Sequence, residues 1–167
     1  GRAFGSDAVP GCYGDLDEAD LIVLVGSNTA WCHPILFRRM ADAKERRGTK
    51  FVVIDPRRTQ TAQESDLFLG IRPGTDSALF SGLLVYLSDN GFRDRAFVDS
   101  HTAGLDGALD RARQIAPDPA AVAAVTGAPA ADIAAPAPPF AAPRRAAPAF
   151  PQGLAPPAPG PAHGHSL

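Results

Sequence analysis

The fold is decided by residues 21–34, which read Leu-Ile-Val-Leu-Val-Gly-Ser-Asn-Thr-Ala-Trp-Cys-His-Pro. Five apolar residues in a row, followed by turn-forming residues, are typical of a strand that is buried on both faces. Gly26 permits a positive φ, while Ser27 and Asn28 add small hydrogen-bonding side chains. Pro34 suits the first position of a helix. The stretch predicts a strand, a polar turn and a helix N-terminus, where backbone N–H groups can meet an anion.

A helix and a second strand follow directly. Residues 35–47 place Leu36, Met40 and Ala43 on one helical face, and Gly48 comes directly after the last turn. Residues 50–54, in which Lys50 precedes an apolar run from Phe51 to Ile54, predict another buried strand. Strand, helix and strand over this length form a βαβ unit, so we expect a parallel sheet with a right-handed crossover.

The remaining elements are shorter or less regular. A helical turn is expected near residues 15–19, before the first strand, and a short third strand near residues 67–71. Thr75 or Asp76 can cap a helix whose broad apolar face comprises Leu79, Phe80, Leu83, Leu84 and Leu87. Further helices are expected near residues 94–100, 105–114 and 118–125.

Composition restricts the kind of partner. The 167 residues include 16 basic and 18 acidic side chains, and the net charge of −2 gives no reason to expect nucleic acid or a membrane as partner. Apolar runs stay well below the roughly 18–20 residues that span a bilayer. Two cysteines suit reduced thiols better than a disulfide framework. No signal peptide or initiator Met is visible, so we expect a cytoplasmic protein whose chain begins partway through a longer one.

Composition changes sharply after Ile133. Residues 134–167 are dominated by Ala and Pro, and their apolar residues follow neither a strand nor a helix period. We therefore expect an α/β domain over residues 1–133, followed by a disordered or extended tail over residues 134–167.

Three polar loops are expected at one edge of the sheet, because parallel strands end on the same edge and open α/β folds bind ligands there. They are residues 26–32, 55–59 and 72–76, and two of them carry Arg near Asp. Backbone N–H groups and Arg suit phosphates, and a carboxylate suits ribose hydroxyls or a guanine edge. Each loop alone is an ordinary turn, but three together favour a bound nucleotide.

Other nucleotide-site patterns fit poorly. The chain has no Gly-Lys-Ser/Thr P-loop. The first turn lacks Gly-x-Gly-x-x-Gly, and Asp55 lies farther from Gly26 than the roughly 20 residues of the dinucleotide fingerprint. A standard nicotinamide site is therefore disfavoured.

No catalytic residue and no metal ligand is predicted. Cys12, Cys32 and His33 lack the spacing of a zinc site, and no acid/base pair stands out. Cys32 is expected to be a small buried thiol, and Trp31 is expected to pack against the sheet rather than stack on a purine. His33 can either donate to a ligand phosphate or cap its own helix.

Four segments carry a family resemblance. In order, they read Val-Pro-Gly-Cys-Tyr (9–13), Gly-Ser-Asn-Thr-Ala-Trp-Cys-His-Pro (26–34), Ile-Asp-Pro-Arg-Arg-Thr (54–59) and Arg-Pro-Gly-Thr-Asp (72–76). They resemble the molybdopterin oxidoreductase superfamily and, within it, the catalytic large subunit of bacterial assimilatory nitrate reductases. The resemblance covers about residues 1–135.

The resemblance implies a Rossmann-like parallel sheet with flanking helices, forming part of a larger enzyme. It also implies a bis(molybdopterin guanine dinucleotide) molybdenum cofactor held between several domains, and a 4Fe-4S cluster. Gly26, Ser27 and Asn28 would lie nearest the phosphates of one guanine dinucleotide, with Asp55 as the carboxylate partner of the guanosine. The residues assigned to the cofactor in this way are Val25, Gly26, Ser27, Asn28, Thr29, Ala30, Trp31, Cys32, His33, Asp55, Pro56, Arg57, Arg58, Thr59, Gly74, Thr75 and Asp76.

Two departures from the family pattern stand out. The cysteines that hold the family's cluster and its molybdenum lie upstream of the matching segment, and Cys12 does not match either set. In the family, the region after Ile133 continues as regular α/β structure, whereas this tail resembles an out-of-frame reading of GC-rich coding sequence. We expect a fragment that is inactive by itself.

The function implied for the parent is reduction of nitrate to nitrite, with electrons reaching the cluster from a donor protein or subunit. The partners implied are that donor, the missing domains of the parent chain and nitrate. A formate dehydrogenase of the same superfamily is the alternative, and a non-catalytic nucleotide-binding fragment is a further one. A nucleotide-binding domain that resembles the middle domain of thiamine-diphosphate enzymes also stays open. Preference for guanine over adenine nucleotides would distinguish it from the molybdopterin reading.

Overall fold

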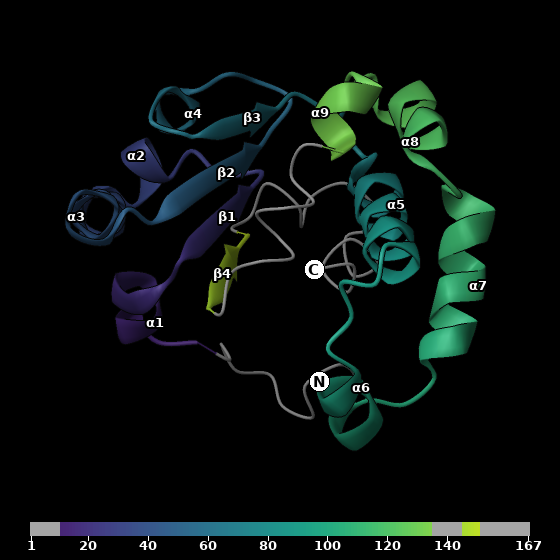
Figure 1. Ribbon diagram of the computed structural model, residues 1–167. Coiled ribbons are helices and arrows are strands. Elements are labelled where there is room, and N and C mark those ends of the chain that lie inside the picture. The colour runs from purple at the N-terminus through teal and green to yellow at the C-terminus, as the bar shows by residue number, and fades with distance from the viewer. Residues whose placement is uncertain (1–10, 135–144, 151–167) are drawn as a thin grey trace.

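The computed structural model describes residues 11–134 and 145–150 (Figure 1). In that part of the chain, four parallel strands form one sheet in the order β3-β2-β1-β4. The strands are β1 (Leu21–Val25), β2 (Lys50–Ile54), β3 (Leu67–Leu69) and β4 (Ala146–Ala149). The expected α/β fold with a parallel sheet is confirmed.

The two central strands are buried on both faces, as their continuous apolar runs predict. Val23 is paired with Val52 in the β1–β2 register. Ile22 and Leu24 belong to the core on one face, together with Met40. Val23 belongs to the core on the opposite face, together with Leu79. Each face of the sheet is thus closed by its own helices.

The first helix layer covers the face that Ile22 and Leu24 point to. It contains α1 (Tyr13–Glu18), α2 (Thr29–Cys32), α3 (Pro34–Arg47) and α4 (Gln60–Gln63). Helix α3 begins at Pro34 and ends at Arg47, and it is followed by Gly48, whose φ of 75° lies in the left-handed region. These boundaries agree with the sequence prediction, because Pro needs no N–H at a first turn and Gly tolerates a left-handed C-terminus.

The second layer covers the other face. It contains α5 (Asp76–Asp89), α8 (Pro119–Thr126) and α9 (Ala130–Ala134), and α7 (Leu105–Ile115) packs against α5. Helix α6 (Arg95–His101) has no buried residue and lies away from the sheet. Helices α5 and α8 meet closely at Gly82, where a Cβ atom would lie 2.1 Å from Cγ2 of Val122. Asp118 caps α8 by accepting a hydrogen bond from the N–H of Ala121 at 2.8 Å, as expected. Within the described residues, no helix is both long enough and apolar enough to cross a bilayer.

Strand β4 was not expected, because it lies in the Ala/Pro-rich tail. It pairs in parallel with β1, and its Pro148 lies opposite Val23. Pro lacks an N–H donor, which an edge strand tolerates. An ion pair between Arg145 and Glu18 anchors the start of the strand. Residues 135–144 and 151–167, the rest of the predicted disordered tail, lie outside the described residues.

The strand order creates a topological switch point beside β1. The chain proceeds from β1 to β2 and β3 in one direction, whereas β4 lies on the opposite side of β1. In open α/β sheets, ligands bind outside the carboxyl ends of strands at such a point. The Gly-Ser-Asn turn that follows β1 therefore lies where the fold most often places a ligand.

Candidate nucleotide-binding site

The first two predicted loops begin side by side at the carboxyl edge of the sheet, and the third follows β3 after Gly70 and Ile71. The N–H of Gly26 donates to the carbonyl oxygen of Ile54 at 2.8 Å, and the N–H of Asp55 donates to that of Leu69 at 3.2 Å. Backbone pairing therefore continues to the last residue of each strand, and the loops leave the sheet from adjacent points.

The loops after β1 and β2 are joined by side-chain hydrogen bonds. Thr61, which is buried in α4, accepts the N–H of Ala30 at 2.9 Å and donates to Oδ1 of Asn28 at 3.1 Å. At the surface, Nε1 of Trp31 donates to Oε1 of Gln60 at 2.6 Å. These bonds make α2 and α4 one structural unit, and the two helices lie close together in Figure 1.

A groove of about 460 Å³ lies between these two helices. Its walls are formed by Asn28, Trp31, Arg57, Thr59, Gln60 and Gln63. Oγ1 of Thr59 is buried and has no hydrogen-bond partner among the described residues. A buried hydroxyl without a partner is costly, so a ligand that exchanges a hydrogen bond with it would be stabilised. The amide of Asn28 and the cation of Arg57 add polar groups that suit a phosphorylated ligand.

The buried part of the first loop is held tightly. Val25, Ser27 and Thr29 are buried, and the hydroxyls of Ser27 and Thr29 share a short hydrogen bond. Gly26 has a φ of 60°, as the turn requires. Asn28 occupies the N-cap position of α2, although its side chain makes no capping bond. This fixed turn brings Asn28 to the groove, whereas the buried side chains of Val25, Ser27 and Thr29 do not line it.

The exposed part of the first loop differs from expectation. Trp31 is 72% exposed and does not pack on the sheet, and the thiol of Cys32 is exposed rather than buried. The side chain of His33 makes no capping bond at the start of α3. The reason is that α2 has four residues and turns Thr29 inward, which leaves its last residues on the outer side.

The second loop contains one turn and two exposed cations. Asp55 is buried, and its Oδ1 accepts the N–H of Arg57 at 2.8 Å, an arrangement typical of an Asx turn. The guanidinium of Arg58 lies 5.2 Å from the ring centroid of Phe68. Pro56 is exposed, and Arg57 is the cation that lines the groove.

The third loop is oriented by the second helix layer. The guanidinium of Arg72 donates to the carbonyl oxygens of Ala124 and Val125, both at 3.2 Å, at the end of α8. Thr75 donates its hydroxyl hydrogen to the carbonyl oxygen of Arg72 at 2.6 Å. Gly74 has a φ of 78°, and Asp76 is the first residue of α5. The guanidinium of Arg72, which was not among the residues assigned to the cofactor, is thus occupied by the end of α8.

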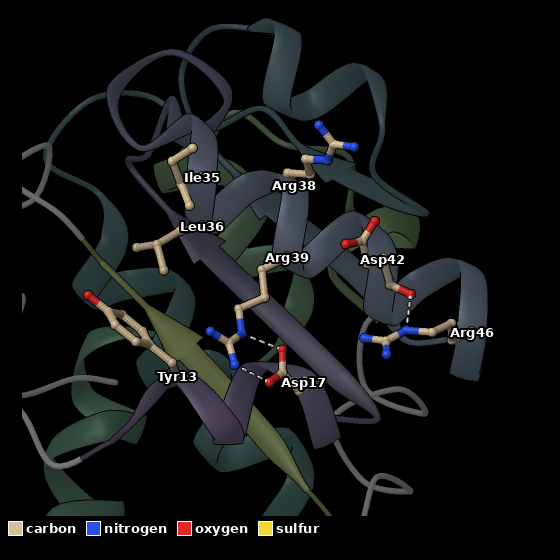
Figure 2. Close-up of a pocket in the computed structure, with 8 residues that line it drawn as sticks. All are labelled: Tyr13, Asp17, Ile35, Leu36, Arg38, Arg39, Asp42 and Arg46. Atoms are coloured by element: carbon tan, nitrogen blue, oxygen red, sulfur yellow. Dashed lines mark hydrogen bonds and ion pairs between the residues drawn. The ribbon is translucent and has the colours of Figure 1, made fainter.

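A second concave surface lies between α1 and α3, away from the predicted residues (Figure 2). This depression has a volume of about 570 Å³ and includes Tyr13, Ile35 and Leu36. At its centre, Nε and Nη2 of Arg39 donate to the two carboxylate oxygens of Asp17 at 2.6 and 2.5 Å. These hydrogen bonds lower the pKa of Asp17 and raise that of Arg39. The central cation is already paired with its own carboxylate, and Arg38, Asp42 and Arg46 also line the depression.

No metal centre is formed by the side chains that the structure describes. Residues 11–134 and 145–150 contain no group of three or more His, Cys, Asp or Glu side chains close enough to hold an ion. Cys12 and Cys32 are both exposed free thiols.

Two groove residues, Gln60 and Gln63, were missed by the sequence analysis, as was the buried Thr61 between them in the chain. They belong to α4, which has four residues and therefore no apolar period to recognise. The partner of Thr61 lies 31 residues earlier in the chain, so local pattern carries no signal for the contact. The polar run that continues past Thr59 is the one hint that the site extends beyond the predicted loop.

Comparison with known proteins identifies the family. The family model described as molybdopterin oxidoreductase matches residues 3–131. The chain belongs to the molybdopterin oxidoreductase family. A nitrate reductase from Shewanella frigidimarina is 50% identical over 126 residues, covering 75% of this chain and 13% of that protein. The F420-dependent formate dehydrogenase 1 subunit alpha of Methanococcus maripaludis is 42% identical over 106 residues, covering 64% of this chain and 16% of that protein.

A solved structure supports the same assignment. Acetylene hydratase from Pelobacter acetylenicus superimposes with a TM-score of 0.73 at 29% identity, covering 83% of this chain and 19% of that one. The chain thus spans between an eighth and a fifth of the length of these family members. Nitrate reductases, a formate dehydrogenase and a hydratase share the fold, so membership in the family does not by itself determine the substrate.

Proposed function

We propose that the groove between α2 and α4 binds one guanine dinucleotide of a bis(molybdopterin guanine dinucleotide) molybdenum cofactor. The observation that supports this most is the polar lining of the groove by Asn28, Arg57 and Thr59. The hydroxyl of Thr59 is itself buried and lacks a partner among the described residues. This donor set suits a ligand rich in acceptor oxygens, and a pyrophosphate is such a ligand.

The proposed roles follow the order of the loops. Gly26, Ser27 and Asn28 face the phosphates, with the segment Val25 to His33 forming that wall. Asp55 to Thr59 meet the guanosine, and Asp55 accepts from the donor edge of guanine, since a carboxylate retains acceptor capacity beyond its bond to the N–H of Arg57. Gly74, Thr75 and Asp76 complete the contact from the third loop.

The parent enzyme is proposed to reduce nitrate to nitrite in nitrate assimilation. When bound, the molybdenum group supplies oxygen-atom transfer, and the residues of this chain bind and orient the nucleotide end of the cofactor. The nitrate reductase relative at 50% identity supports nitrate as substrate. A formate dehydrogenase-type enzyme is the second candidate, favoured by the relative at 42% identity.

The remaining parts of the proposal concern the parent protein. A 4Fe-4S cluster, an electron-donor protein or subunit and further domains are proposed partners, and a cytoplasmic location is proposed. The chain by itself is proposed to be inactive, because no metal-ligand cluster occurs among its described residues. Purified 167-residue chain should reduce no nitrate with reduced viologen beyond a cofactor-free control, and turnover above that control would contradict this part of the proposal.

Nucleotide titration tests the binding proposal. Isothermal calorimetry of the 167-residue chain with GDP, GMP, ADP and AMP should show a preference for guanine of about fivefold or more, the value of one additional hydrogen bond. Preference for adenine, or binding of none of the four, would overturn the guanine dinucleotide site.

A further inference from the structure

Thr61 occupies an unusual position between two loops. Its side chain is buried, and it belongs to α4, yet both of its hydrogen-bond partners lie in the loop after β1. It accepts from the N–H of Ala30 in the first turn of α2, a donor that an N-cap side chain satisfies in many helices. In effect, Thr61 caps α2 from another part of the chain.

This contact frees the N-cap residue itself. Asn28 is the N-cap of α2, but its side chain makes no capping bond and instead lines the groove. Its Oδ1 accepts the hydroxyl hydrogen of Thr61 at 3.1 Å. The polar side chain at the start of α2 is therefore available for a ligand.

The same contact fixes which way the Asn28 amide points. The Thr61 hydroxyl has one hydrogen, and its oxygen already accepts the N–H of Ala30. If the amide were flipped, Nδ2 would face this oxygen and the buried hydroxyl hydrogen would lose its acceptor, which is costly in a buried site. Oδ1 therefore faces Thr61, and the Nδ2 hydrogens remain for the groove.

We propose that Thr61 is a positioning residue that holds the Asn28 amide with its Nδ2 donors presented to a phosphate group in the groove. The inference rests on the proposed nucleotide site and adds to it a residue and a direction of hydrogen bonding. A donor at this position favours a phosphate oxygen over any group that can only donate.

The test compares Thr61→Val, which keeps the shape but removes the hydroxyl, with Thr61→Ser, which keeps the hydroxyl. Calorimetry of the full chain with GDP and with guanosine separates phosphate recognition from recognition of the base. Thr61→Val should weaken GDP binding about tenfold, as expected for the loss of one hydrogen bond to a charged group, and leave guanosine binding unchanged. Thr61→Ser should retain GDP affinity within about twofold of the unmodified chain.

The outcomes separate this inference from the site proposal. If the unmodified chain binds no guanine nucleotide, the site proposal fails. If it binds GDP and Thr61→Val binds GDP equally well, or loses GDP and guanosine to the same degree, Thr61 does not position a phosphate donor and the inference is overturned.

A second measurement applies even where guanosine binds too weakly for calorimetry. The NMR signals of the Asn28 side-chain NH2 should shift on addition of GDP in the unmodified chain and in Thr61→Ser, but not in Thr61→Val. Unchanged Asn28 signals in a chain that does bind GDP would also overturn the inference.

Discussion

The loops after β1 and β2 differ from the loop after β3 in what holds them. The first two are joined through Thr61, a short buried side chain that connects α4 with α2. The third is held by Arg72, a long exposed side chain that reaches the carbonyl oxygens at the end of α8. All three leave the same edge of the sheet with similar composition. An Arg at this edge of the sheet can therefore hold a neighbouring helix as readily as it can bind an anion.

The two attachments have different consequences for a ligand. A hydroxyl between two short helices leaves a groove between them, with Asn28 and Thr59 in its walls. A guanidinium spread over the end of α8 fills its surroundings, since a Cβ on Gly127 would lie 3.2 Å from Nε of Arg72. We therefore assign the main binding role to the joined loops and a completing role to the third.

The largest effect is expected where α5 meets α8, the helix that anchors Arg72. In Gly82→Ala, the new Cβ would lie 2.1 Å from Cγ2 of Val122, so helices must move apart. Overpacking of this kind should lower the free energy of unfolding by about 1–3 kcal/mol. Urea denaturation, monitored by circular dichroism, measures this change in the free energy of unfolding.

Gly107→Ala in α7 is the matched control. A Cβ there meets no atom within 4 Å, so the better helix propensity of Ala should raise the free energy of unfolding by up to about 1 kcal/mol. Equal stability of the two variants would show that the contact between α5 and α8 is not tight.

Two arginine substitutions should separate packing from binding. Arg72→Ala removes two hydrogen bonds to α8 and should lower the free energy of unfolding by about 1 kcal/mol while leaving GDP affinity unchanged. Arg57→Ala should change stability by less than about 0.5 kcal/mol but weaken GDP binding about fivefold, because this exposed cation lines the groove. Arg38→Ala, an exposed arginine in the depression between α1 and α3, is the control for the loss of one positive charge. The reverse pattern, with Arg72 needed for GDP and Arg57 not, would contradict the division of roles.

The smallest effect is expected at Asp66, which directly precedes β3 and therefore lies at the amino-terminal ends of the strands, opposite the three loops. Partial burial raises the pKa of this carboxyl, but hydrogen bonds from the N–H of Phe51 and from Lys44 and Lys50 outweigh it and lower the pKa below its ordinary value. A lowered folded-state pKa stabilises the protein above the unfolded-state pKa of about 3.9, and this contribution is lost as the pH falls through the folded-state pKa.

Asp66→Asn should therefore cost about 0.5 kcal/mol or less at neutral pH, because its partly exposed ion pairs are screened by solvent, and less still at about pH 2. Urea denaturation at both values measures the difference, and GDP affinity should not change. A cost that stays constant across this range would show that ionisation of Asp66 does not contribute to stability.

Local sequence pattern was enough to predict the elements that have a continuous apolar run or a repeated apolar face. Residues 21–25 and 51–54 are continuous apolar runs, and α3 has an apolar face with Pro34 at its start and Gly48 directly after its end. The three loops on one edge followed from the parallel sheet. The two helices of four residues, α2 and α4, could not be recognised, because one turn shows no period.

Long-range contacts explain the other differences. Trp31 is exposed and its indole N–H bonds to Gln60 in α4, 29 positions later in the chain. The contact of Thr61 with Ala30 joins residues 31 positions apart. Strand β4 has the low strand propensity of Ala and Pro, and it forms because β1 offers an unpaired edge. These features arise from tertiary structure rather than from local sequence.

Hydrogen exchange of the 167-residue chain with and without GDP tests the central claim most directly. The account predicts slower amide exchange in residues 26–33 and 57–63 and a smaller change in residues 74–76, because the joined loops form the main walls of the site. GDP-dependent slowing confined to residues 13–18 and 34–47, which flank the depression between α1 and α3, would contradict it, as would binding that changes no amide in the joined loops.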